Sequence, residues 1–254
     1  MEINPFFQRL DLLVGDQAAV SLRQSRVIVF GLGGVGSWCA EALVRSGVGR
    51  ISLVDSDAVE ASNVNRQLQA TSSTIGRLKT DALEDRLKDI NPSCDVRSFP
   101  RVFSAETADA FDIGGADYVI DAIDSLAHKL CLIETAHASG ARVFSSMGMA
   151  QKLDPTLIKT ADIWKTHGCP LARLVRYGLR KRAFRGRFTA VYSPERQPRL
   201  AAAALALPSP GAGGTWDAGK KAINGTSVAV TATAGMVLAS LVVRDAAKPG
   251  GRLS

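Results

Sequence analysis

The chain contains a glycine-rich turn between a strand-like and a helix-like segment, and this turn restricts its possible folds most. Residues 27–30, Val-Ile-Val-Phe, are typical of a buried parallel strand, and Gly-Leu-Gly-Gly-Val-Gly follows at residues 31–36. Glycines allow a tight turn, a close approach of phosphate to the backbone, and close packing of the helix predicted over residues 35–46. That helix would direct its amino end toward an anion. The predicted phosphate-binding positions are Gly31, Gly33, Gly34 and Gly36.

A carboxylate follows at the spacing that nucleotide-binding folds use. A second apolar strand at residues 51–54 leads to Asp55, roughly 20 residues beyond the glycines, where such folds place an acid for a ribose hydroxyl. Strands and helices then alternate as far as about residue 148. This order predicts an α/β fold, a Rossmann-like, doubly wound and mainly parallel sheet.

We expect a single adenylating-type domain over residues 1–254, with an elaborated C-terminal part. Its nucleotide-binding core would span about residues 24–148, and an extension on the substrate side about residues 149–243. Further strands are expected at residues 95–99, 117–124, 142–145 and 189–193. Helices are expected at residues 6–22, 77–91, 106–111 and 125–139, and a loop at residues 201–221.

The cysteines and the apolar segments indicate where the protein works. Four cysteines are scattered without a CxxC pair, which argues against a disulfide framework and a structural zinc site and favours a reducing compartment. The first residues lack the basic and apolar regions of a secretory signal. Residues 225–243 are nearly uncharged but contain too few strongly apolar side chains for a membrane span. We therefore expect a cytoplasmic protein without a membrane segment, and a packed core helix at residues 225–243.

Positive charge is concentrated in one part of the extension. The formal net charge is +7, and residues 173–187 contain seven cations and no acid. Such a stretch predicts a surface that contacts the phosphates of a nucleic acid; the alternative is a helix face exposed only to solvent. The seven residues are Arg173, Arg176, Arg180, Lys181, Arg182, Arg185 and Arg187.

A polar segment at residues 57–67 is predicted to be an active-site loop with a short helical turn. Its candidate ligand-binding residues are Asp57, Asn63, Arg66 and Gln67. Lys79 lies in the first turn of the next helix, where the helix dipole disfavours a cation unless something negative is near. Arg66 and Lys79 could each be ordinary surface cations. Their order after a phosphate-binding turn instead predicts a bound polyanion.

The charges favour ATP over a nicotinamide cofactor. A hydride-transfer enzyme has no use for Arg66 and Lys79 beside its phosphates, whereas an anionic carboxylate that attacks a triphosphate needs fixed cations and a metal ion. Asp124 follows a buried strand, at the edge where open α/β sheets bind ligands. It suits Mg²⁺, which takes one or two protein carboxylates, although it could merely cap a helix. The set predicts adenylation of a carboxylate with ATP and Mg²⁺.

The motifs resemble those of the ubiquitin-activating-like superfamily of adenylating enzymes, which includes the bacterial activators MoeB and ThiF. The matching segments are GLGGVGSWCAEALVRSGVG, DSDAVEASNVNRQ, IGRLK ending at Lys79, INP at residues 90–92, and DAIDS at residues 121–125. In that superfamily the acid matching Asp55 holds the ribose. The residues matching Asn63, Arg66 and Lys79 engage phosphates, and the acid matching Asp124 binds magnesium. The resemblance therefore assigns Arg66, Lys79 and Asp124 catalytic roles.

The resemblance also implies a homodimer. An arginine matching Arg9 reaches the triphosphate from the partner subunit in that superfamily. The usual Arg-Phe-x-Arg lead-in reads Phe6-Phe7-Gln8-Arg9 here, so the first arginine is lost. Cys169 stands where an aspartate is expected. Both departures raise the question of altered activity.

Within the superfamily the chain is most similar to the tRNA threonylcarbamoyladenosine dehydratases. The segments that carry this similarity are SWCAEALVRSGVG, DIWKTHGCPLARLVRYGLRKR, AVYSPE and GTSVAVTATAG. The resemblance implies ATP-dependent cyclisation of threonylcarbamoyladenosine in tRNA through an adenylated carboxylate, and leaves open whether a sulfur-transfer protein associates. One alternative is adenylation of the C-terminus of a small sulfur-carrier or ubiquitin-like protein. A second is a non-catalytic nucleotide- or NAD-binding protein.

Overall fold

The computed structural model describes residues 4–196 and 225–248, which form a seven-stranded sheet covered by helices on both faces. The strand order is β3-β2-β1-β4-β5-β7-β6, and the β6–β7 pair is antiparallel while the other pairs are parallel. The strands are β1 Arg26–Phe30, β2 Arg50–Val54, β3 Asp95–Phe99, β4 Tyr118–Asp121, β5 Arg142–Ser146, β6 Lys159–Asp162 and β7 Thr189–Tyr192. The predicted doubly wound α/β fold is confirmed.

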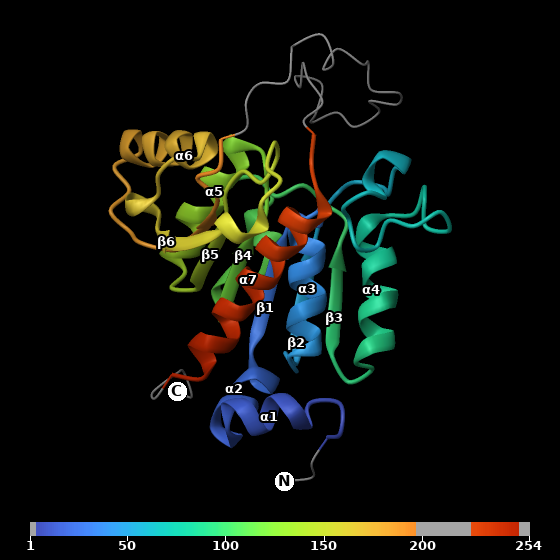
Figure 1. Cartoon of the computed structure of the whole chain (residues 1–254). Coiled ribbons are helices and arrows are strands. Elements are labelled where there is room, and N and C mark those ends of the chain that lie inside the picture. The colour runs from blue at the N-terminus through green and yellow to red at the C-terminus, as the bar shows by residue number, and fades with distance from the viewer. Residues whose placement is uncertain (1–3, 197–224, 249–254) are drawn as a thin grey trace.

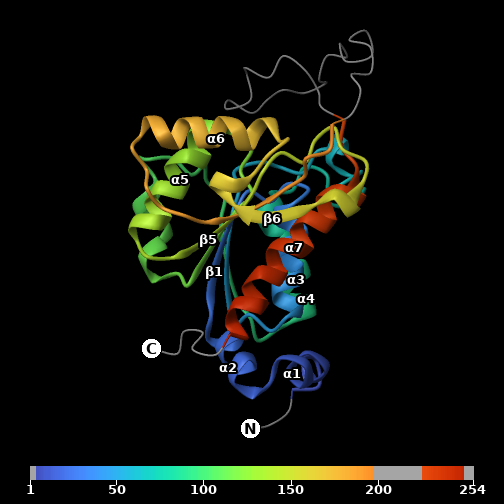
Figure 2. The ribbon, with the colours of Figure 1, turned by 60° about the vertical axis from the view of Figure 1, so that its left-hand side comes forward.

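Seven α-helices surround this sheet in the described residues. They are α1 Gln8–Val14, α2 Asp16–Gln24, α3 Gly36–Arg45, α4 Lys79–Ile90, α5 Leu126–Ala138, α6 Pro170–Lys181 and α7 Val228–Ala246. Figure 2 shows α3, α4 and α7 on one side of the sheet and α5 on the other, with α6 across the end. The residues after position 149 add β6, β7, α6 and α7 to this same sheet and its layers.

The central strand β1 is buried on both faces, as its unbroken apolar sequence predicts. Val27 and Val29 join the core beneath α3 and α7, whereas Ile28 and Phe30 join the core beneath α5. Alternate side chains of a strand point to opposite faces, so one apolar run supplies both cores. The buried strand fixes the position of the glycine turn that follows it.

Helix α7 packs closely against α3. A Cβ atom on Gly235 would lie 2.5 Å from the carbonyl oxygen of Val35, so only glycine permits this approach. Leu238 and Val242 are fully buried, whereas Met236 is 44% exposed. By length and composition α7 could cross a membrane, yet here it contributes one face to the core, as the sequence predicted.

The structure corrects several predicted boundaries. The expected helix at residues 6–22 is two helices, because Gly15 has φ +84° and breaks the chain between α1 and α2. The strand expected at residues 117–124 ends at Asp121, which leaves Asp124 in the loop before α5. The helix at residues 106–111 is a 3₁₀ turn, Ala108–Phe111. Strand β6 was not predicted, and the loop predicted at residues 201–221 lies outside the described residues.

Candidate nucleotide site at the carboxyl edge of the sheet

The carboxyl ends of the three central strands meet at one edge of the sheet. Phe30 of β1 pairs with Val54 of β2 and with Asp121 of β4, so the three strands end at the same level. The glycine turn, Asp55 and the loop that carries Asp124 follow directly from these ends. The sheet register therefore brings together segments that are far apart in the sequence.

The glycines of the turn serve different purposes. Gly31 has φ +86°, and a Cβ atom there would lie 2.8 Å from the carbonyl oxygen of Ala122. A Cβ atom on Gly36 would lie 1.8 Å from the carbonyl oxygen of Gly31. A Cβ atom on Gly33, in contrast, would meet no protein atom within 4 Å. The fold itself thus requires glycine at Gly31 and Gly36, while Gly33 faces open space, as a ligand-facing position would.

Asp55 is tied to the glycine turn. Its Oδ2 accepts a hydrogen bond from the backbone N–H of Leu32 at 2.7 Å, and its Oδ1 accepts one from the N–H of Asp57 at 2.9 Å. Burial raises the pKa of Asp55, and the nearby Lys79 ammonium partly opposes this shift. The carboxylate is therefore held in a fixed place at the end of β2 with little contact with solvent.

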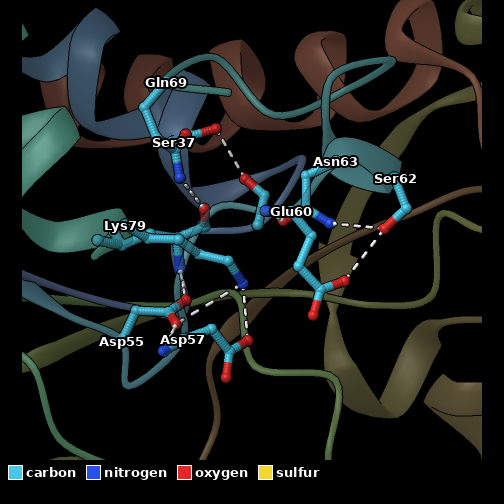
Figure 3. Close-up of polar contacts among 10 residues, drawn as sticks. Ser37, Asp55, Asp57, Glu60, Ser62, Asn63, Gln69 and Lys79 are labelled. Atoms are coloured by element: carbon cyan, nitrogen blue, oxygen red, sulfur yellow. Dashed lines mark hydrogen bonds and ion pairs between the residues drawn. The ribbon is translucent and has the colours of Figure 1, made fainter. Parts of the chain in front are cut away.

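Lys79 lies in the first turn of α4 as predicted, although the helix begins at Lys79 and not at residue 77, and its counter-ions belong to the protein. Its Nζ lies 2.7 Å from Oδ2 of Asp57 and 3.8 Å from Oδ1 of Asp55, and the side chain is buried (Figure 3). These two carboxylates supply negative charge next to Lys79, which the sequence led us to expect from a ligand. Because Asp57 remains partly exposed, a phosphate could compete with it for the ammonium group.

Arg66 lies against the glycine turn. Its Cγ is 3.2 Å from the Cβ position of Gly34, and its Nη1 donates to the carbonyl oxygen of Ser62 at 2.8 Å. Burial lowers the pKa of the Arg66 guanidinium, while the charges of Asp124 and Glu60 act in the opposite direction. The Arg66 guanidinium is thus close enough to Asp124 to feel its charge, and its side chain lies beside the turn.

Two other residues predicted in this loop, Asn63 and Gln67, differ in their hydrogen bonding within the protein. Asn63 and Glu60 form a capping box around a short 3₁₀ helix, Ala61–Asn63, which confirms the predicted helical turn (Figure 3). Gln67 and Gln69 each bury an amide oxygen that meets no donor within the described residues. The amide nitrogen of Gln69 donates to the carbonyl oxygen of Leu32 at 2.8 Å and ties this loop to the glycine turn.

Arg9 lies at the opposite edge of the sheet from its own glycine turn. It is exposed on α1, and the ring of neighbouring Phe7 packs 3.4 Å from the Cβ position of Gly47, just before β2 begins. Figure 1 shows α1 and α6 at opposite ends of the molecule. Five residues of β-strand span about 16 Å, so Arg9 is not brought together with Arg66 and Lys79 of the same chain.

The predicted basic surface is partly paired within the protein. The first part of this stretch lies in α6, which ends at Lys181. Nη1 of Arg182 lies 2.6 Å from Oε2 of Glu134, and Nε of Arg187 lies 3.9 Å from Oδ2 of Asp162. Three further cations have uncharged partners: Arg176 contacts the Thr166 hydroxyl, Arg180 lies over the Trp164 ring and Lys181 lies over the Tyr177 ring. Arg173, Lys181 and Arg185 form no ion pair with an acid in the described part of the chain.

A buried charge cluster beside the site was not predicted. Lys129 is fully buried, and its Nζ lies 2.7 Å from Oδ2 of Asp121 and 3.0 Å from the carbonyl oxygen of Ser146. Oδ1 of Asp121 accepts from the N–H of Ile123 at 3.1 Å and so orients the loop that leads to Asp124. Lys129 is the single lysine of α5, and the sequence contains no signal that distinguishes it from a surface residue.

Cys169 is buried directly before α6, where it occupies the N-cap position without a side-chain hydrogen bond to the helix. The site contains no group of three His, Cys, Asp or Glu side chains that could hold a metal, as is true of all the described residues.

Comparison with known proteins places this site in a family. The model of the ThiF family matches residues 7–248. A tRNA threonylcarbamoyladenosine dehydratase of Bacillus subtilis is 46% identical over 189 residues, which cover 74% of this chain and 74% of that protein. The adenylyltransferase and sulfurtransferase UBA4 of Saccharomyces cerevisiae is 32% identical, over 61% of this chain and 35% of that protein.

Solved structures show the same fold over nearly the whole chain. The Escherichia coli tRNA N6-threonylcarbamoyladenosine dehydratase TcdA, in complex with ATP, superposes with a TM-score of 0.83 and 29% sequence identity. The match covers 97% of each chain, and the same enzyme in complex with AMP matches equally well. With the family model matched from α1 to the end of α7, this chain belongs to the ThiF family.

Proposed function

We propose that this protein is an ATP-dependent tRNA threonylcarbamoyladenosine dehydratase that cyclises its substrate through an adenylated carboxylate. The observation that carries the proposal is the meeting of Lys79, Arg66 and Asp124 at one glycine turn at the carboxyl edge of the sheet. The extensive similarity to dehydratases, one of them solved with ATP, names the substrate class.

In this proposal ATP lies along the glycine turn. Its phosphates approach the backbone at Gly33, where a Cβ atom would meet no protein atom, and the amino end of α3 favours their charge. Asp55 accepts a hydrogen bond from the ribose, and Lys79 transfers its contact from Asp57 to a phosphate. The unpaired buried oxygen of Gln67 supports its place among the nucleotide-binding residues, which would also include Asn63.

Asp124 would hold Mg²⁺ together with phosphate oxygens and water. Mg²⁺ usually takes only one or two protein carboxylates and fills its other positions with phosphate oxygens and water, so a single aspartate would suffice. When bound, the ion would neutralise charge that develops on the phosphates. Arg66 has its stem packed against Gly34, from where its guanidinium would stabilise the charge of the phosphoryl group under attack.

The reaction has two steps. A carboxylate oxygen of the threonylcarbamoyl group attacks the α-phosphorus of ATP, and the bond from that phosphorus to pyrophosphate breaks. A nucleophilic atom of the same threonylcarbamoyl group then attacks the activated carbonyl carbon, loses its proton, and displaces AMP. One carboxylate oxygen leaves with AMP, so the elements of water are removed overall. The protein contributes position and fixed charge to both steps.

The proposal includes a homodimer, because in the superfamily that the chain resembles the arginine matching Arg9 reaches the triphosphate of the partner subunit. The place of α1, at the opposite end of the sheet from the glycine turn of its own chain, supports this. In the dimer Arg9 would complete the site of the partner subunit.

We further propose that residues 24–148 form the nucleotide-binding core and residues 149–243 the substrate-side extension. The cations Arg173, Lys181 and Arg185 would contact tRNA phosphates. The protein would work in the cytoplasm, with or without a sulfur-transfer protein.

The test is substrate-dependent ATP cleavage. Purified protein with Mg²⁺ should release pyrophosphate and AMP when given tRNA that carries threonylcarbamoyladenosine, and should release neither with a sulfur-carrier protein or with unmodified tRNA. Lys79→Ala and Asp124→Ala should each slow the reaction about 30- to 700-fold, since one lost transition-state contact costs about 2–4 kcal/mol. Cleavage that depends on a carrier protein instead of tRNA would replace the proposal with the sulfur-carrier function.

A further inference from the structure

Helix α6 exposes a tyrosine in the centre of its basic face. The ring-bearing side chain of Tyr177 is 57% exposed, and Leu174 beside it is 45% exposed. Ala172, Val175 and Leu179 on the other face of α6 are buried in the core. The tyrosine is therefore not needed to anchor the helix, and its large aromatic surface faces outward.

The surroundings of Tyr177 are cationic. Arg173 and Lys181 lie one helical turn before and after it, so the three side chains are neighbours on the helix surface. The Nζ of Lys181 lies 4.8 Å from the centre of the Tyr177 ring, over its face. A cation on one face leaves the opposite face of an exposed ring available to a planar group. No acid lies on the outward face of α6 among the residues from Pro170 to Lys181.

The position of α6 places this ring at the functional edge of the sheet. Gly178 packs against Leu130 in the first turns of α5, and Leu171 lies 3.4 Å from the Cβ position of Gly148, just beyond β5. Both contacts are at the carboxyl ends of the strands, where the glycine turn also lies. Figures 1 and 2 show α6 across that end of the molecule.

We propose that Tyr177 stacks on an unpaired base of the substrate tRNA next to the modified adenosine. This inference rests on the proposed function and extends it from phosphate contacts to a base contact. An enzyme that acts on a base needs that nucleotide out of a duplex, so its neighbours include unpaired bases. Exposed aromatic rings set among cations are the usual platforms for such bases, and each stacked base strengthens binding about 5- to 150-fold.

The test separates stacking from charge. The affinity for tRNA that carries threonylcarbamoyladenosine is measured at several salt concentrations for wild type, Tyr177→Ala, Tyr177→Leu and Tyr177→Phe. Tyr177→Ala and Tyr177→Leu should bind about 5- to 150-fold more weakly with an unchanged salt slope. Tyr177→Phe should bind like wild type because it keeps the ring. Arg173→Ala, the matched control, should instead reduce the salt slope by about one unit.

Catalysis and folding give independent readouts. Tyr177→Ala should raise the KM for tRNA, keep kcat at saturating tRNA, and melt at the temperature of wild type. Two results would overturn the stacking proposal: wild-type tRNA affinity in Tyr177→Ala, or a changed salt slope in place of an equal loss of affinity at every salt concentration. The proposed function would still stand in either case if the wild-type protein cleaves ATP with this tRNA. Failure of the wild type itself to cleave ATP with this tRNA would refute the proposed function first.

Discussion

The glycine turn permits a paired experiment that separates folding from nucleotide binding. Gly33→Ala adds a methyl group where no protein atom lies within 4 Å, whereas Gly36→Ala places one 1.8 Å from the carbonyl oxygen of Gly31. The same chemical change, three residues apart, should therefore damage two different properties. Gly33→Ala should impair ATP binding alone, and Gly36→Ala should impair the fold.

The sizes of the two effects follow from these distances. To relieve the contact at Gly36, the start of α3 must move by roughly 1 Å from β1, an overpacking that costs about 3 kcal/mol or more. That cost corresponds to a fall in melting temperature of about 6–12 °C for a domain of this size. Gly33→Ala should change the free energy of unfolding by less than about 0.5 kcal/mol. If it removes one backbone hydrogen bond to a charged phosphate, ATP affinity should fall about 10- to 150-fold.

Urea denaturation and calorimetric titration with ATP and Mg²⁺ measure the two properties on the same samples. Wild-type ATP affinity in a correctly folded Gly33→Ala protein would show that the phosphates do not approach the backbone there. A fully stable Gly36→Ala protein would contradict the packing of α3 on the turn. A combined loss of stability and affinity in Gly33→Ala would also refute the reasoning, because it would mean that Gly33 is required by the fold.

Three further predictions concern residues outside the turn. Lys129→Met should lower the free energy of unfolding by about 3–5 kcal/mol in urea denaturation, because Asp121 is left buried without a counter-ion. The double variant with Asp121→Asn should recover much of the lost stability, and a single variant as stable as wild type would contradict the pairing. A mixture of Arg9→Ala and Lys79→Ala subunits that exchange should regain part of the ATP cleavage that each lacks alone, because some mixed dimers carry one intact site; an inactive mixture would show that Arg9 does not act across the interface. Cys169→Ser should form cyclised product at a near-normal rate, because Cys169 is buried and the substrate supplies its own nucleophile; loss of product with retained ATP–pyrophosphate exchange would make it a covalent catalyst.

The sequence predicts the nucleotide half of the fold well, because each of its signals is local. The apolar run before the glycines and the acid at Asp55 lie where they were expected, and Lys79 lies in the first turn of a helix as expected. Strand β6 was missed because its sequence, Lys-Thr-Ala-Asp, has no apolar run, and its pairing with β7 depends on tertiary contacts. The division at Gly15 depends on one positive φ angle, which a sequence does not reveal.

The sequence predicts which residue types line the candidate site, but not which side chains pair with one another there. The Arg66 guanidinium is close enough to Asp124 to feel its charge. Lys79 is neutralised by Asp57 and Asp55, and no sequence rule gives that pairing. The three residues come together because the loop after β2 folds back on itself, through a bridge between Ala58 and Leu78 and a hydrogen bond from the Lys79 N–H to the Asp57 carbonyl oxygen at 2.9 Å. No sequence rule gives the pairing of Lys129 with Asp121 either, because their contact requires that α5 pack on β4.

The fate of one oxygen atom tests the adenylation proposal most directly. The substrate carboxylate of threonylcarbamoyladenosine in tRNA is labelled with the heavy isotope of oxygen, and the protein is given ATP and Mg²⁺. Attack by that carboxylate on the α-phosphorus requires that AMP released with the cyclised nucleoside carry one labelled oxygen, detectable by mass spectrometry. Unlabelled AMP, or cyclisation that releases ADP and phosphate, would contradict an adenylated carboxylate and with it the proposed role of the glycine turn.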